Sequence, residues 1–271
     1  MDFRSASLSE LALVLDWAKA EGWNPGLEDV AAFYSADPGG FFVAVEDDQP
    51  VASISIVNHS DRFAFLGLYI CTPEFRGRGI GFELWQHGLM HAGNRTVGLD
   101  GVAEQQGNYR KSGFELSGTT QRYEGLIEGR GQNAIRAFSK LDTWVHDLDS
   151  SATGVDRQEF LNTWIEQKET RSTLVSADRD GFVTVRKCQS GVKIGPLTAT
   201  TRKIAIDLLH AAAAIFPGED CIIDVPQEQQ ELAEYCAILG MNVTFATARM
   251  YKGKPPAPNQ LIHAVATLEL G

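Results

Sequence analysis

The chain contains an internal repeat with a spacing of about 127 residues. Each copy ends with a glycine followed by an apolar residue and, about ten residues later, a tyrosine two places before a glycine. These markers match Gly113-Phe114 with Gly240-Met241, and Tyr123 with Tyr251. Upstream, the acidic turn at residues 46–48 has a counterpart at 178–180, and Cys71-Thr72 matches Leu197-Thr198. Because a repeat of this length is the size of one domain, the sequence predicts two copies of one fold.

A short stretch rich in glycine and polar residues, Glu128 to Asn133, lies between the copies and has the composition of a linker. We therefore expect an N-terminal domain at residues 1–128 and a C-terminal domain at 134–271. With 271 residues, of which 44% are apolar, the chain can bury two cores.

Local patterns predict the element order of the first copy. Ser7 and Glu10 form a capping box ahead of apolar residues at helical spacing, which predicts a helix ending near Gly22. Two β-rich runs around an acidic turn predict a hairpin at about residues 41–57. A strand ending at Cys71, a helix from about Ile80, a strand within 95–102 and a helix carrying Tyr109 follow. The expected order is β-α-β-β-β-α-β-α-β.

The segment Arg76-Gly77-Arg78-Gly79-Ile80-Gly81 lies between the apolar run at 63–71 and the helix expected from Ile80. Glycines let the backbone take turn conformations that are closed to other residues, and they let a ligand approach the main chain. A helix N-terminus adds unpaired N–H groups and the positive end of its dipole. The sequence therefore predicts a cradle for a phosphate-bearing ligand.

The glycine spacing excludes two common nucleotide loops. A dinucleotide fingerprint starting at Gly77 needs a glycine where Phe82 stands, and a P-loop needs a Gly-Lys-Ser/Thr end that is missing. The pattern Arg/Gln-x-x-Gly-x-Gly instead resembles the loop of the GCN5-related N-acetyltransferases (GNAT family). The segment "NYRKSGF" (108–114) resembles that family's Tyr-x-x-x-Gly-Phe motif, and "GLYICTPEF" (67–75) resembles its splayed central strand. "EGWNPG" (21–26) resembles one two-domain branch of the family.

This resemblance implies an α/β (α+β) fold of tandem GNAT-like domains, each a mixed, mostly antiparallel twisted sheet flanked by helices. It also implies acetyl-CoA as co-substrate. The backbone of Tyr69, Ile70 and Cys71 is expected beside the acetyl carbonyl and pantetheine. The expected pyrophosphate-binding residues are Arg76, Gly77, Arg78, Gly79, Ile80, Gly81 and Phe82.

The resemblance also suggests catalytic and acceptor residues. Tyr109 matches the tyrosine that protonates the departing thiolate in many family members. Glu21 and Trp23 lie in the loop expected to overhang the acceptor site, where they would bind an ammonium group by charge and cation–π contact. The family's strand glutamate is missing, since apolar residues occupy 63–66, and Val102 stands where the family has an asparagine. Glu21, Asp100 and Glu104 remain as candidate bases.

The second copy lacks these features. The segment "TTRKIAIDLL" (200–209) replaces the loop, and no glycine occurs between Gly195 and Gly218. Cys236 stands at the position of Tyr109, and Tyr235 one place earlier would point about 100° away on a helix. We expect a degenerate GNAT-like domain that packs against the first or shapes the acceptor pocket.

Composition limits the remaining possibilities. No apolar run is long enough to span a membrane, no signal segment is present, and four scattered cysteines suggest a reduced protein, so we expect a cytoplasmic protein. A net charge of −11 disfavours nucleic acid and favours a cationic acceptor. His87 and His91 have metal-ligand spacing, but Gly88 replaces the glutamate of H-E-x-x-H, so no metal is expected.

Two functions are compatible with these sequence features. The first is an N-acetyltransferase that transfers an acetyl group from acetyl-CoA to an amine by direct attack, with one site in the N-terminal domain. The second is a regulatory or scaffolding protein that binds acetyl-CoA or coenzyme A without turnover. The acceptor is open among small amines, amino acids, antibiotics and protein lysines, with a small-molecule amine favoured, and the oligomeric state is unknown.

Overall fold

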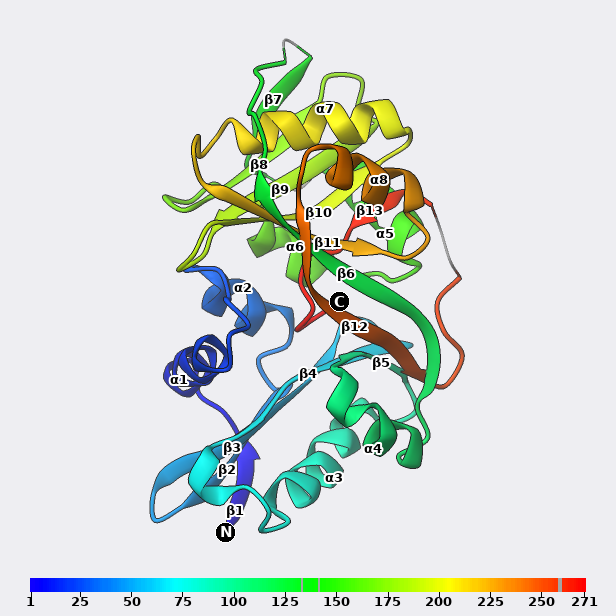
Figure 1. Cartoon of the computed structure of the whole chain (residues 1–271). Coiled ribbons are helices and arrows are strands. Elements are labelled where there is room, and N and C mark those ends of the chain that lie inside the picture. Colours follow the sequence, from blue (N-terminus) through cyan, green and yellow to red (C-terminus); the bar gives the residue numbers. More distant parts are fainter. Residues whose placement is uncertain (133, 141, 258–259) are drawn as a thin grey trace.

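The computed structural model describes residues 1–132, 134–140, 142–257 and 260–271. The N-terminal half of the chain contains six strands and four α-helices (Figure 1). In chain order they are β1 (Asp2–Ser5), α1 (Leu8–Ala20), α2 (Asp29–Ala36), β2 (Phe41–Glu46), β3 (Gln49–Asn58), β4 (Phe63–Cys71), α3 (Ile80–Ala92), β5 (Thr96–Gly101), α4 (Gln106–Lys111) and β6 (Glu115–Leu126).

The second half repeats this order, which confirms that the chain holds two copies of one fold. Its elements are β7 (Ile135–Phe138), α5 (Thr143–Thr153), α6 (Gln158–Trp164), β8 (Arg171–Ser176), β9 (Gly181–Lys187), β10 (Val192–Ala199), α7 (Arg202–Ala213), β11 (Asp220–Pro226), α8 (Gln230–Ile238) and β12 (Asn242–Lys252). One further strand, β13 (Ile262–Ala264), follows. Asn133, the last residue of the expected linker, lies outside the described residues.

The predicted element order was wrong in one place, because it lacks the short helix α2. Helix α2 has eight residues and no side-chain hydrogen bond at its N-cap, so its sequence carries neither a long apolar period nor a capping signal. The capping box of α1 is confirmed, since Ser7 Oγ accepts from Glu10 N and Ser7 N donates to the Glu10 carboxylate. The hairpin of β2 and β3 is also confirmed.

The strands form one twisted, mostly antiparallel sheet in the order β1-β2-β3-β4-β5-β12-β6-β11-β10-β9-β8-β7, with β13 paired to β10. The two copies exchange their last strands: β12 pairs with β5 of the first copy, and β6 pairs with β11 of the second. The long strands β6 and β12 also pair with each other and cross between the halves (Figure 1). Each half of the sheet is therefore completed by a strand of the other.

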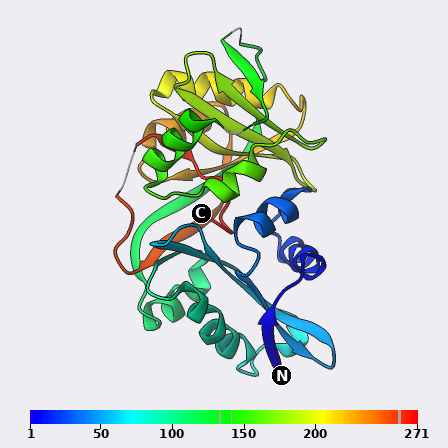
Figure 2. The ribbon, with the colours of Figure 1, turned by 180° about the vertical axis from the view of Figure 1, so that it is seen from behind.

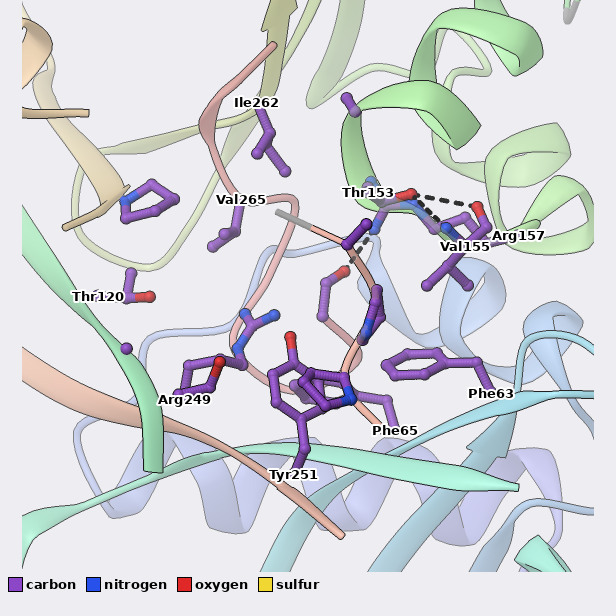
Figure 3. Close-up of a pocket in the computed structure, with 18 of the residues that line it drawn as sticks. Phe63, Phe65, Thr120, Thr153, Val155, Arg157, Arg249, Tyr251, Ile262 and Val265 are labelled. Carbon is purple, nitrogen blue, oxygen red and sulfur yellow. Dashed lines mark hydrogen bonds between the residues drawn. The ribbon is translucent and has the colours of Figure 1, made fainter. Parts of the chain in front are cut away.

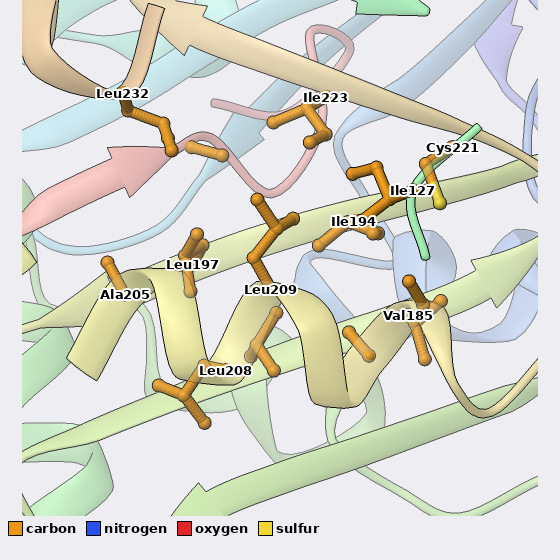
Figure 4. Close-up of a cluster of buried hydrophobic side chains, with 14 of the residues drawn as sticks. Ile127, Val185, Ile194, Leu197, Ala205, Leu208, Leu209, Cys221, Ile223 and Leu232 are labelled. Carbon is orange, nitrogen blue, oxygen red and sulfur yellow. The ribbon is translucent and has the colours of Figure 1, made fainter. Parts of the chain in front are cut away.

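Helices cover both faces of the sheet. In the N-terminal half, α3 packs over β2, β3 and β4 in one apolar core, and α1 and α2 pack in another. The view from behind shows α1 and α2 beside the C-terminal half (Figure 2). In the C-terminal half, Leu208 and Leu209 of α7 lie over Val185, Ile194 and Ile223 of the central strands (Figure 4). None of the described helices is long and apolar enough to cross a membrane.

Candidate active site

A cavity of about 300 Å³ lies where β4 and β5 diverge. These parallel strands pair only at residues 63–66 of β4 and 96–99 of β5. Beyond that point, the side of β4 that faced β5 borders the cavity. Residues of the second copy line the cavity as well, namely Thr244, Phe245, Thr247, Leu268 and Glu269. The C-terminal copy therefore forms part of the cavity wall.

A β-bulge shapes β4 at this point. Leu68 and Tyr69 together lie between the pairs Ser53–Ile70 and Ser55–Gly67, and Leu68 has a φ of 44°. The hydroxyl of Ser53 donates to the Leu68 carbonyl over 2.7 Å, which holds the bulge. A bulge redirects side chains. Tyr69 lines the cavity, whereas the side chain of Ile70 is buried in the α1 and α2 core and Cys71 is half-buried at the end of β4.

The glycine loop has the backbone conformation that a nest of amides requires. Gly77 and Gly79 have φ values of 77° and 83°, and a Cβ at either position would meet no atom within 4 Å. Gly79 is the N-cap of α3, and no side chain caps the helix there. The start of α3 is therefore uncapped by side chains and lies beside two open glycine positions, an arrangement that fits an anionic group such as a pyrophosphate.

The other residues expected at this loop have different surroundings. Ile80 and Phe82 belong to the first turn of α3, where the side chain of Ile80 is buried and that of Phe82 is exposed. The guanidinium of Arg78 lies 4.6 Å from the centre of the Phe75 ring. Arg76 donates to the Cys71 carbonyl over 2.8 Å, so it ties the loop to the end of β4.

Tyr109 projects from α4 into the same cavity. Its ring stacks on Trp85 with centroids 5.5 Å apart, and the Tyr69 ring meets Trp85 edge-on with centroids 5.4 Å apart. Burial, with a smaller contribution from Tyr69, raises the pKa of the Tyr109 hydroxyl above its usual value. The hydroxyl therefore keeps its proton at neutral pH.

Glu21 and Trp23, the residues predicted to bind the acceptor, also line the cavity. The Glu21 carboxylate forms an ion pair with Arg76 and so links the loop after α1 to the glycine loop. The second copy holds this loop in place. Lys193 Nζ donates to the Trp23 carbonyl over 2.9 Å, and Asn24 Nδ2 donates to the Ser190 carbonyl over 2.8 Å.

The candidate bases differ in their surroundings. Asp100 lines the cavity, but Arg249 Nε and Nη2 donate to its two oxygens at 2.8 and 2.7 Å. Glu104 is exposed and outside the cavity lining. Two carboxylates that sequence reasoning missed, Glu124 of β6 and Glu269 near the C-terminus, line the cavity. No motif marks either, because each reaches the cavity only through the pairing of the two copies.

In the second copy, a side chain and a strand occupy the places that are open in the first copy, at the start of the helix and beside the central strand. Thr201 caps α7 by accepting from Ile204 N over 3.3 Å, whereas no side chain caps α3 at Gly79. Strands β10 and β11 pair only at residues 192–194 and 221–223, and β13 pairs with β10 beyond that point, at Leu197 and Thr198. The hydroxyl of Tyr235, one place before the position of Tyr109, is hydrogen-bonded to His210 Nε2 over 2.7 Å.

A second cavity, of about 280 Å³, lies between the halves. Phe63, Phe65 and Tyr251 gather on one side of it and Val155 and Thr153 on another (Figure 3). Its two arginines are paired, Arg157 with Asp149 and Arg249 with Asp100. It is mainly an apolar space rather than a site of proton transfer.

In the described residues, no three His, Cys, Asp or Glu side chains converge to hold a metal ion. His91 Nε2 lies 2.7 Å from the Asp37 carboxylate, and the His87 ring packs edge-on against Phe42. These contacts account for both histidines as packing residues.

Comparison with known proteins identifies the fold family. A model described as "Acetyltransferase (GNAT) family" matches residues 9–114, and one described as "Acetyltransferase (GNAT) domain" matches residues 145–264. The holothin acyltransferase of Pseudoalteromonas sp. (strain SANK 73390) is 34% identical over 277 residues, covering 99% of this chain and 94% of the relative. This chain belongs to the GNAT family. It is a two-domain member of that acyltransferase family.

Solved structures share the GNAT fold over the whole chain. A putative acetyltransferase from Pyrococcus horikoshii superposes with a TM-score of 0.86 at 23% identity, covering 100% of this chain and 95% of that one. A tandem GNAT protein from the clavulanic acid biosynthesis pathway superposes with a TM-score of 0.61 at 13% identity, covering 96% and 99%. At these identities the likeness concerns the fold alone, and it includes the tandem arrangement.

Proposed function

We propose that this GNAT protein transfers an acetyl group from acetyl-CoA to a small-molecule amine, with one active site in the N-terminal copy. The observation that carries the proposal is the start of α3, which no side chain caps and where Gly77 and Gly79 have left-handed backbones with open space around them. A diphosphate bound there would place the rest of an extended ligand along β4.

The residues around the cavity have the chemistry that this reaction needs. Beyond Leu66, β4 has no β5 partner, so a pantetheine arm and the acetyl oxygen would lie along this unpaired side of the strand. Tyr109 would donate a proton to the departing sulfur, because a thiol with a pKa near 8.5 leaves most readily when it is protonated. Its buried hydroxyl stays protonated in the working range.

Charge and size support a small cationic acceptor. The cavity is lined by four carboxylates, Glu21, Asp100, Glu124 and Glu269, and by one arginine, Arg122, which is paired with Asp224. A primary amine carries a positive charge at neutral pH. A cavity of about 300 Å³ is at the small end of ligand sites. Because its full-length relative is named a holothin acyltransferase, holothin belongs among the acceptors to test.

The test follows free thiol while the protein is incubated with acetyl-CoA and a panel of amines that includes holothin. We expect thiol release that depends on both the protein and one class of amine, together with an acetylated product of the corresponding mass. Tight acetyl-CoA binding without thiol release for any amine would instead favour a coenzyme A-binding regulatory protein. The apolar residues 63–66, where family members carry a glutamate, are the observation that supports this second function.

A further inference from the structure

We propose that Glu269, in the segment after β13, is the base that accepts the proton of the acceptor amine. This inference rests on the proposed function. It assigns to the end of the second copy a role that β4 of the first copy cannot fill, because residues 63–66 carry no carboxylate.

The segment after β13 is held against β4 at the edge of the cavity. A Cβ at Gly67 would overlap with the carbonyl oxygen of Glu269, so only glycine allows the two backbones this approach. His59 Nε2 lies 2.8 Å from the Leu270 carbonyl, and Gly271 N donates to the Thr267 carbonyl over 3.1 Å. These contacts fix the backbone on both sides of Glu269. The residue therefore occupies a set position beside the β4 bulge.

The side chain of Glu269 is nearly enclosed. The residue is 6% exposed, yet it lines the cavity together with Tyr69 and Tyr109. The hydroxyl of Thr267 donates to its carboxylate. A carboxylate that is removed from bulk water and faces a reaction cavity is well suited to proton transfer.

The charged groups around Glu269 act on its carboxylate from a distance. In the part of the chain that the structure describes, it belongs to no ion pair, although Arg122 and Lys193 act on it electrostatically. Burial lowers the pKa of Lys193, and among the surrounding charges Glu269 opposes this most. The titratable or charged groups that face the carboxylate or share its cavity are Glu21, Tyr69, Asp100, Tyr109, Arg122, Glu124 and Lys193.

The other cavity carboxylates fit the role less well. Both oxygens of Asp100 accept hydrogen bonds from Arg249, and the Glu21 carboxylate meets Arg76. Glu124 is opposite Asn242 on β12, whereas Gly101 at the end of β5 is opposite Ala248. Those two β12 positions are about 20 Å apart along a strand, which puts Glu124 toward the second copy. Glu269 alone combines burial with a position beside β4.

The proposed step conserves atoms and charge. The amine nitrogen forms a bond to the thioester carbonyl carbon, and the carbon–sulfur bond breaks. Glu269 takes one proton from the ammonium and releases it to solvent, and after the attack it takes the second proton that the nitrogen loses. The sulfur leaves with the bonding electron pair and takes a proton from Tyr109, and solvent then returns the second proton from Glu269 to the tyrosine. The net products are the amide, the free thiol and one proton released to solvent.

The first test compares Glu269→Gln with the wild-type chain on its best amine. We expect kcat/KM to fall by about 100-fold or more, with unchanged acetyl-CoA affinity by calorimetry. The limb set by the carboxylate should be replaced by a rise in activity that continues up to the pKa of the amine, because activity would then follow the fraction of free amine. Glu269→Asp, which keeps a carboxylate, should restore part of the activity. Glu115→Gln, an exposed glutamate outside the cavity, should behave as wild type.

The second test uses Thr267→Val, which removes a hydrogen-bond donor from the carboxylate and keeps the side chain's shape. This variant also tests the role of Glu269 if the Glu269→Gln protein does not fold. The midpoint of the acidic limb should move to higher pH by about half a unit, because the charged form of the base loses a donor. An unchanged limb here, or a Glu269→Gln protein with wild-type kcat/KM, would overturn the role of Glu269 while leaving acyl transfer intact. If the wild-type chain releases no thiol with any amine, both proposals fall.

Discussion

At the scale of single residues, small side chains make room for the aromatic group at the cavity. A Cβ at Gly101 would lie 2.8 Å from the Tyr109 ring, and one at Gly81 would lie 2.7 Å from the Tyr69 hydroxyl. Both contacts are too close for an alanine. Gly101 and Gly81 therefore set how near the two tyrosines stand to the ends of β5 and α3.

Substituting Tyr109 tests its role as the proton donor. Tyr109→Phe removes the hydroxyl and keeps the ring that stacks on Trp85, so acetyl-CoA binding should persist while kcat falls by about 100-fold. Because burial raises the pKa of Tyr109, loss of wild-type activity from its ionisation should begin only above pH 10. Steady-state kinetics across pH would measure both effects. A Tyr109→Phe protein with wild-type kcat would make Tyr109 a packing residue.

The sequence could predict Tyr109 and Tyr69 as cavity residues because each belongs to a motif with fixed local spacing. It could not predict Glu269, since the position of that residue depends on a backbone approach to Gly67, some 200 residues earlier. Nor could it show that Asp100 is paired, because Arg249 reaches it through the exchanged strand β12. Contacts between the copies join residues that are far apart in the chain, so no local sequence pattern marks them.

At the scale of elements, α3 and α7 start in opposite ways although they occupy the same place in the repeat. Gly79 begins α3 with a left-handed backbone and no side-chain cap, whereas Thr201 caps α7 with its hydroxyl. A side chain that fills the amide site removes the space for an anion. The sequence could predict this difference from the glycines alone. It could not predict that β13 fills the gap beside β10.

Substituting Gly79 tests the anion cradle. Gly79→Glu would put a carboxylate beside the bound pyrophosphate and would strain a position with a φ of 83°, so acetyl-CoA affinity should fall at least about tenfold. Gly218→Glu is a matched control, because Gly218 has a φ of 84° and open space around it in the second copy. Calorimetry would compare the two. Equal affinities in two folded variants would argue against the loop as the binding site.

At the scale of the whole molecule, a buried ion-pair group joins the copies. Asp29 of α2 is 1% exposed and lies 2.7 Å from Arg171 and 3.1 Å from Arg186, both in the second copy. Both guanidinium groups stack over the ring of Trp164. Burial alone would raise the pKa of Asp29, but the charges of Arg186 and Arg171 outweigh it and lower the pKa.

Removing the charge of Asp29 should lower the stability of the folded protein. Asp29→Asn leaves two buried arginines without their counter-charge, so the free energy of unfolding should fall by about 3–5 kcal/mol. Because the folded-state pKa is lowered, the stabilisation is present above the unfolded value near 3.9 and is lost as pH falls below it. Urea unfolding of both proteins at pH 7 and at a pH of about 2.5 would measure the difference. The exposed Asp178→Asn should change stability little at either pH, and an Asp29→Asn protein as stable as wild type would contradict this assignment.

The repeat in the sequence predicted two copies of one fold, but it could not predict how the copies join. A repeat fixes the element order within each copy, and β6 and β12 have the same place in that order. Either strand can pair with the open edge of β5 or of β11. Whether each copy uses its own last strand or that of the other copy therefore depends on tertiary contacts of the complete protein. The division at residues 128 and 134 therefore stays a prediction about the sequence.

The central claim is that one copy binds the acyl donor while the other completes its site. The most direct test is the stoichiometry of acetyl-CoA binding to the full chain, measured by calorimetry. We predict one molecule per chain, with no second site appearing at higher ligand concentration, because Thr201 and β13 fill the equivalent space in the second copy. Two molecules per chain, or no binding at all, would contradict the account.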